Sequence, residues 1–315
     1  AHGYLFVRDL FDGETITHAR RDIRKLLVAA GFVEECPRRE LKWSGRWPEG
    51  DLLQCTGTVG RQISELESFH NVIYAEPLLG LLRELFDGEV FSWVENADRA
   101  RIQFRDEVGT TAGGQQVSFT TPAHQDGYHF PVSFVTVWVP LMDIDLATGG
   151  LTIRQGSHRE GLQQHWWQGP VYLGIPEDAE EQSRFAELGG VAVAGDVSPT
   201  AQKKTWLRSD YRAGDALIFH SRMVHRGVSN RTDQLRISAD LRYQRTDSPM
   251  VWQANCRLHE CHAYLNETRD LLNQVGLEPT VADCVWEVPR RSGPQEGTAV
   301  KQQVQDLVEE YEKGR

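Results

Sequence analysis

The residues with the most recognisable chemistry form a His-Gln-Asp run at positions 124–126. On an extended strand alternate side chains share a face, so His124 and Asp126 point the same way and Gln125 points the opposite way. A further histidine, His225, follows in the second half of the chain. Two imidazoles and one carboxylate can occupy one face of an octahedral iron(II) ion and leave three positions open for a 2-oxo acid and O2. A His-X-Asp pair alone is a weak signal, because many such pairs are structurally idle.

An arginine after the second histidine strengthens this interpretation. Arg236 stands eleven residues beyond His225, in a stretch where apolar residues alternate with polar ones. The alternation predicts a strand with one apolar face, and its polar face carries Arg236 and Ser238. An arginine in this place can bind the distal carboxylate of 2-oxoglutarate through two parallel hydrogen bonds. The alternative is a surface arginine on a half-exposed strand.

Further short motifs surround these residues in a fixed order. Together they make the chain resemble the phytanoyl-CoA dioxygenase family of iron(II)- and 2-oxoglutarate-dependent oxygenases, over roughly residues 70–245. A helix that starts at Glu76-Pro77 also fits this family. The matching motifs are His124-Gln125-Asp126, Trp138-Val139-Pro140-Leu141, Thr148-Gly149-Gly150-Leu151, Gly156-Ser157-His158, Gly214-Asp215, Phe219-His220, His225, Asn230-Arg231-Thr232 and Arg236.

The resemblance implies both a fold and a set of ligands. The fold is a double-stranded β-helix, or jelly roll, with helices packed outside it. The iron(II) ligands would be His124, Asp126 and His225. Arg236 would anchor the cosubstrate 2-oxoglutarate, and Trp138 matches a family tryptophan near that cosubstrate.

Other contacts to 2-oxoglutarate are less closely defined. Gln103 and Thr121 are candidates for further contacts, and the alternative is that both simply line the barrel. The family often has a serine two positions after the second ligand histidine, where this chain has Gly227. That contact is therefore lost or replaced, and Ser238 is the candidate replacement.

The reaction implied by the resemblance is oxidation of an unactivated C–H bond in a small organic molecule. Oxidative decarboxylation of 2-oxoglutarate by O2 yields succinate and CO2 and drives hydroxylation. Related enzymes carry out desaturation, epoxidation or ring formation, and the sequence does not distinguish these outcomes. Halogenases of this family replace the metal-binding aspartate with a small residue, so Asp126 argues against halogenation. Two alternatives are an oxygenase for a protein or peptide side chain and a non-catalytic metal-binding jelly roll.

A long segment at residues 157–211 interrupts the motifs and carries the aromatic run His165-Trp166-Trp167. Long insertions in compact domains are often lids or binding loops, so we expect this one to form a mobile wall of the substrate pocket. Trp166 and Trp167 would then face the substrate, and the alternative is that they pack the insertion onto the barrel. His129, just beyond the metal motif, is a further candidate for lining the pocket.

The sequence predicts that strands position these residues, with helices before and after the strands. Helical spacing of apolar residues predicts a helix near residues 13–30 and another from Glu76 to Asp87. Between them and the C-terminus the short, β-rich stretches predict an antiparallel jelly roll. We expect a single domain, 1–315, with a helical part at 1–88, a jelly-roll core at 89–245 and a helical part at 246–315. The expected strands are residues 90–94, 101–104, 117–125, 134–141, 151–154, 216–220 and 235–243.

Composition excludes some function classes. The chain has 315 residues and a formal net charge of -11, which argues against a nucleic-acid binder. Its longest apolar run, near residues 130–142, is too short to cross a bilayer, and the first residues do not resemble a signal peptide. The five cysteines form an irregular set typical of free thiols in a reducing compartment. These features predict a cytoplasmic enzyme whose partner is a small-molecule substrate, with no nucleic acid and no membrane; the oligomeric state is open.

Overall fold

The computed structural model describes residues 2–35, 41–46, 57–92, 99–106, 120–128, 133–168, 171–195, 197–198 and 204–248. The chain divides into two compact units, residues 1–126 with 134–246 and residues 127–133 with 247–315. All the helices and strands named below belong to the first unit. The expected helical C-terminal part lies almost entirely outside the described residues, as do His129 and the five cysteines.

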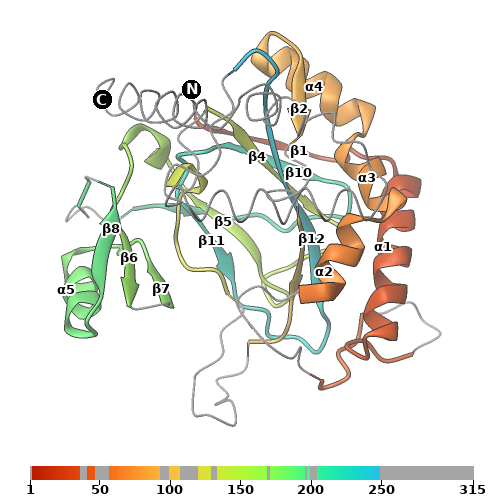
Figure 1. Ribbon diagram of the computed structural model, residues 1–315, viewed down its shortest axis with the longest axis horizontal. Coiled ribbons are helices and arrows are strands. Elements are labelled where there is room, and N and C mark those ends of the chain that lie inside the picture. The colour runs from red at the N-terminus through yellow and green to blue at the C-terminus, as the bar shows by residue number, and fades with distance from the viewer. Residues whose placement is uncertain are drawn as a thin grey trace, which may run out of the picture. The chain divides into compact units, whose positions relative to one another are not determined.

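Four helices lie in the described part of residues 1–88, and two of them, α1 and α4, match the helices expected from the sequence. The first is capped by Asp12, whose carboxylate accepts a 2.7 Å hydrogen bond from the backbone N–H of Thr15. Its buried residues recur at helical spacing and join one apolar core with residues of the sheet. Figure 1 shows these helices together on one side of the large sheet. The helices are α1 (Gly13–Ala29), α2 (Gly57–Ser64), α3 (Glu67–Ile73) and α4 (Glu76–Phe86).

The larger sheet is antiparallel, in the order β1-β10-β4-β12-β2, with β3 also pairing with β12. Strand β1 was not predicted, because four residues place only two side chains on each face. Tyr4 and Phe6 pack against the core, whereas Leu5 is exposed. The strands are β1 (Tyr4–Val7), β2 (Val90–Ser92), β3 (Arg99–Gln103), β4 (Val135–Pro140), β10 (Ala216–His220) and β12 (Arg236–Arg245).

The smaller sheet, in the order β11-β5-β9, completes the jelly roll. Its strands are β5 (Gly150–Arg154), β9 (Trp206–Leu207) and β11 (His225–Val228). Leu151 and Ile153 of this sheet share one core with Val137 and Leu217 of the larger sheet. Two sheets with a shared core confirm the predicted fold class.

The insertion is more regular than its sequence suggests. Strands β6 (His165–Gln168), β7 (Val171–Gly174) and β8 (Val191–Ala194) form a third sheet in the order β7-β6-β8. Helix α5 (Ala179–Glu187) buries only Phe185. The strands were missed because each has only four residues and β8 leaves Val191 and Val193 exposed, so no buried face shows in the pattern.

Candidate metal centre

Strand pairing brings the two histidines of the predicted site together. His124 lies in the extended segment beside β11, and His225 is the first residue of β11. Their backbones exchange two N–H···O hydrogen bonds of 2.9 Å, and their ring centroids lie 4.1 Å apart. Phe219 of β10 packs on the His225 ring, with ring centroids 4.6 Å apart. The site therefore lies where the two sheets of the jelly roll face each other.

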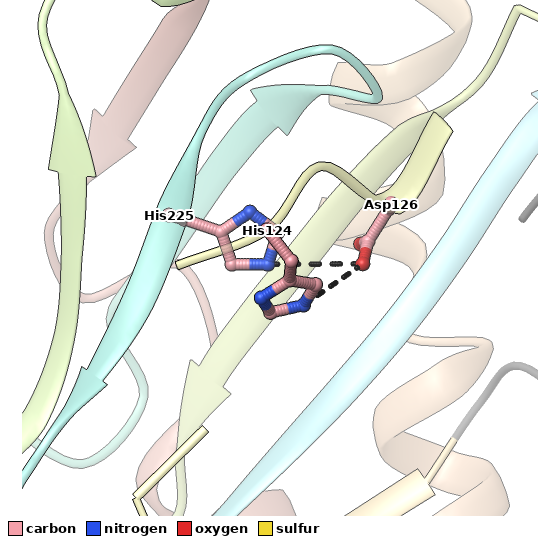
Figure 2. A group of neighbouring side chains, drawn as sticks. All are labelled: His124, Asp126 and His225. Carbon is pink, nitrogen blue, oxygen red and sulfur yellow. Dashed lines mark ion pairs between the residues drawn. The ribbon is translucent and has the colours of Figure 1, made fainter. Parts of the chain in front are cut away.

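Asp126 completes a cluster with the two imidazoles. Its Oδ1 atom lies 3.4 Å from Nε2 of His124 and 3.7 Å from Nε2 of His225, as the dashed lines in Figure 2 show. One ligand atom from each of the three residues lies within 4.8 Å of the others. The side chain of Asp126 is 3% exposed. The close approaches count as ion pairs only if the imidazoles are protonated.

The backbone fixes which ring nitrogen of each histidine faces the cluster. Nδ1 of His124 lies 2.9 Å from the carbonyl oxygen of Pro122, and Nδ1 of His225 lies 2.9 Å from that of Met223. A carbonyl oxygen only accepts, so each Nδ1 carries the proton and each Nε2 presents a lone pair. Burial lowers the pKa of His225 to about 4, so this imidazole is neutral near pH 7.

Asp126 stays ionised despite its burial. Burial raises the pKa of the carboxyl group, but the Arg242 guanidinium beside it holds that pKa well below its ordinary value. Three acceptors therefore converge on one point, namely two imidazole lone pairs and a carboxylate oxygen. These three acceptors do not satisfy one another, so together they suit a divalent cation such as iron(II).

Arg236 lies on β12, opposite Gln103 of β3. The arginine is 7% exposed, and its guanidinium donates to Oε1 of Gln103 and, at 2.9 Å, to Oγ of Ser238. Its guanidinium carbon lies 5.9 Å from the ring centroid of Trp138. Four residues predicted to contact 2-oxoglutarate therefore lie together, namely Arg236, Gln103, Ser238 and Trp138.

Gly227, which stands where the family often has a serine, packs closely against the backbone of Thr121. The carbonyl oxygen of Thr121 accepts a 3.0 Å hydrogen bond from the N–H of Gly227. A Cβ atom at Gly227 would lie 3.2 Å from the backbone nitrogen of Thr121. This tight approach favours glycine, while Ser238 supplies a hydroxyl beside Arg236. Thr121 itself is exposed, and its backbone makes the contact.

Gln125, between two of the candidate ligands, ties the insertion to the metal centre. Its side chain donates to the carbonyl oxygens of Gly161 (2.9 Å) and Arg222 (2.7 Å) and accepts from the N–H of Gln163 (2.8 Å). Its backbone N–H donates to Nε2 of His165 at 3.2 Å. Gln125 and His165 are both fully buried. Apart from the expected position of Gln125 on the opposite face of the motif, no sequence pattern predicts this link.

We expect His165→Ala to loosen the metal motif, because the buried N–H of Gln125 loses its acceptor. An unsatisfied buried donor costs about 1–3 kcal/mol. Denaturant unfolding should show this loss, and anaerobic iron(II) titration should show weaker binding. His165→Gln, whose amide oxygen can accept the same bond, is the matched control. Equal iron affinity in all three proteins would contradict a link between the insertion and the ligands.

Trp166 and Trp167 lie within the insertion's own sheet. Trp166 is 8% exposed and packs near Phe185 of α5, with ring centroids 6.3 Å apart. Trp167 packs on Tyr172 of β7 at 5.0 Å, and the hydroxyl of Tyr172 donates to the carbonyl oxygen of Ala123 at 3.0 Å. Both ring contacts lie within the insertion itself, whereas the hydroxyl of Tyr172 contacts the barrel.

A cavity of about 380 Å³ adjoins the segments that carry the histidines. One side is formed by residues 120–123, which precede His124, and by residues 226–229, which follow His225. The other side comes from the insertion and consists of Leu173, Ile175, Glu177, Glu181 and Phe185. Trp166 does not line the cavity, but its ring lies near that of Phe185, which does.

A family model supports this reading of the geometry. The model described as phytanoyl-CoA dioxygenase matches residues 1–238, about three quarters of the sequence. The chain belongs to the phytanoyl-CoA dioxygenase family. It is therefore a non-haem iron(II)- and 2-oxoglutarate-dependent dioxygenase, with O2 as the second cosubstrate.

Similar proteins include characterised members with named substrates. The 1-deoxypentalenic acid 11-beta-hydroxylases of Streptomyces exfoliatus and Streptomyces arenae are 24% and 26% identical over 294 residues, which cover 90% of this chain and 90% of each relative. The ectoine dioxygenase of Nocardia farcinica is 21% identical over 253 residues, 79% of this chain and 76% of that protein.

A solved structure supports the fold. The epimerase SnoN, in complex with Fe3+, alpha ketoglutarate and nogalamycin RO, aligns with a TM-score of 0.51 and 18% identity, covering 79% of this chain and 81% of SnoN. Among the described residues of this chain, no helix is long and apolar enough to span a membrane.

Proposed function

We propose that His124, Asp126 and His225 hold iron(II) and that the enzyme hydroxylates a C–H bond of a small organic molecule. The observation that carries this proposal is the convergence of two imidazole lone pairs and one ionised carboxylate between the sheets. When bound, the iron and 2-oxoglutarate supply the oxidant, and the cosubstrate is consumed to succinate and CO2. The protein contributes position and the exclusion of water.

Arg236 is the proposed anchor for the distal carboxylate of 2-oxoglutarate. Gln103 and Ser238 hold the guanidinium in place within the buried interior of the barrel. A held arginine loses little further freedom when it binds a carboxylate, so the cosubstrate enters a preorganised site. Trp138 forms a wall beside the arginine and limits access of water.

The cavity beside the histidines is the proposed route and pocket for the substrate. Its volume lies within the range typical of small-molecule sites. Apolar residues form much of its lining, and the charged Glu177, Glu181 and Arg226 lie among them. Arg226 pairs with Glu177 and lies over the ring of Trp206, 4.2 Å from its centroid. A pocket of this size suits a small compound.

The named activities of the relatives support the same substrate class. One pair of relatives is named for the hydroxylation of 1-deoxypentalenic acid, and another relative is named for ectoine. Both names refer to small organic molecules. A panel of compounds of this size should therefore contain one that stimulates succinate formation by the iron-loaded enzyme. A protein that binds iron but forms succinate with no compound and no peptide would support a non-catalytic role.

Once a substrate is known, Trp166→Ala should uncouple the reaction. Without Trp166, Phe185 loses its support, so the substrate is held less closely while 2-oxoglutarate still binds. The ratio of oxidised product to succinate should fall, with the affinity for 2-oxoglutarate unchanged. Val193→Ala is the control, because Val193 is exposed on β8 of the third sheet, the sheet that also contains Trp166. A normal ratio of oxidised product to succinate in the Trp166 variant would show that the insertion does not hold the substrate.

A further inference from the structure

The second oxygen of the Asp126 carboxylate is held by two donors that come from outside the ligand set. Oγ1 of Thr136 donates to Oδ2 at 2.5 Å, and Nη2 of Arg242 donates to the same oxygen at 3.0 Å. Thr136 on β4 and Arg242 on β12 stand directly opposite each other in the sheet. Oδ1 faces the two histidines instead, as Figure 2 shows.

These contacts fix the rotation of the carboxylate. A carboxylate oxygen offers about two lone-pair sites, and on Oδ2 the hydroxyl and the guanidinium use both. Asp126, Thr136 and Arg242 are all buried, so water cannot replace a lost bond. Turning Oδ2 toward the histidines would break one neutral and one charge-assisted hydrogen bond inside the protein.

Arg242 also pairs with a second carboxylate. Its Nη2 lies 3.4 Å from Oδ2 of Asp240, and that carboxylate oxygen also accepts a 3.0 Å bond from Arg101. Positive and negative groups therefore alternate along Asp126, Arg242, Asp240 and Arg101. Buried charges that are paired in this way resist displacement, since moving one leaves its partner without compensation. Arg242 cannot follow Asp126 if the carboxylate turns.

We propose that Thr136 and Arg242 are positioning residues that restrict Asp126 to a single-oxygen contact with iron(II). This inference rests on the proposed function. Two histidines and one carboxylate oxygen leave three metal positions, of which 2-oxoglutarate takes two and O2 takes one. An aspartate bound through both oxygens would occupy one of these three positions. Holding Oδ2 therefore keeps a position open for the cosubstrates.

The test compares three affinities in each variant under anaerobic conditions. Iron(II) binding is measured by titration, 2-oxoglutarate binding by the visible charge-transfer band of its iron complex, and access to the O2 position by the electron paramagnetic resonance signal with nitric oxide. Thr136→Val keeps the shape and removes the donor, whereas Thr136→Ser keeps the hydroxyl. Arg242→Gln and Arg242→Lys form the parallel pair.

Thr136→Val and Arg242→Gln should retain or increase iron(II) affinity, because the freed carboxylate can use both oxygens. Affinity for 2-oxoglutarate or nitric oxide should fall by about tenfold or more, a usual effect of losing a ligand's hydrogen-bond partner. Thr136→Ser should restore wild-type values, and Arg242→Lys should restore them in part. Arg245→Gln removes another cation of β12, which bonds the backbone carbonyls of Phe86 and Asp87, and should change none of the three affinities.

Two results would overturn the inference. If iron(II) affinity falls in parallel with the other two, Thr136 and Arg242 only stabilise the fold around the ligands. If all three affinities stay at the wild-type level in Thr136→Val and Arg242→Gln, the two donors do not control the carboxylate. Failure of the wild-type protein to bind iron(II) would instead refute the proposed function.

Discussion

Replacing any one of the three candidate ligands should abolish turnover. His124→Ala and His225→Ala each remove one of two neutral nitrogen donors and leave a site that binds iron(II) only weakly. Asp126→Ala has a second effect, because it removes one of the two carboxylates that pair with the buried Arg242. Breaking a buried ion pair costs about 3–5 kcal/mol, so this variant should also lose stability. Anaerobic iron titration and denaturant unfolding measure the two effects separately.

His220→Ala is the control for these three variants. His220 lies on β10, where its N–H donates to the carbonyl oxygen of Gly3 and its Nδ1 accepts from the N–H of Arg222. The variant should keep its iron, although it loses a packing contact. Full activity in the His124, Asp126 and His225 variants would refute the assignment of the metal centre.

The metal centre could be predicted because its signals are local or ordered along the chain. The His-X-Asp spacing identified His124 and Asp126, but the strand predicted at residues 117–125 was wrong for its described part, where His124 makes an isolated bridge and Asp126 begins a 3-10 helix. The apolar alternation around Arg236 shows which residues of β12 face inward. By the same alternation Asp240 and Arg242 share the face of Arg236, so a signal for Arg242 was present in the sequence.

Other parts of the structure depend on contacts between distant residues. Strand β11 has only four residues, and its place is set by pairing with β5 and with His124. The link from Gln125 to His165 joins residues far apart in the sequence, and neither residue type indicates the other. The third sheet, β7-β6-β8, which lies in the insertion, also consists of four-residue strands. Hydrophobic periodicity needs longer segments than these to be recognised.

Replacing Arg236 should weaken binding of 2-oxoglutarate while iron binding stays near normal. In Arg236→Leu the distal carboxylate would lie in the barrel without its charged partner. Truncating one side of a buried, hydrogen-bonded charge pair costs about 2–5 kcal/mol, which corresponds to roughly thirtyfold to several thousandfold in affinity. Arg236→Gln keeps some hydrogen bonding but no charge, so its loss should be smaller than that of Arg236→Leu.

The measurement is an anaerobic titration of the iron(II) protein with 2-oxoglutarate, followed through the charge-transfer band. Ser238→Ala provides a graded comparison, because it removes one contact that holds the guanidinium and leaves the charge in place. Its effect on affinity should lie well below that of Arg236→Leu, since a neutral hydrogen bond contributes about 0.5–1.5 kcal/mol. If Arg236→Leu binds 2-oxoglutarate as tightly as the wild type, another cation must hold the distal carboxylate. Arg242, which faces the same interior from β12, would then be the first residue to test.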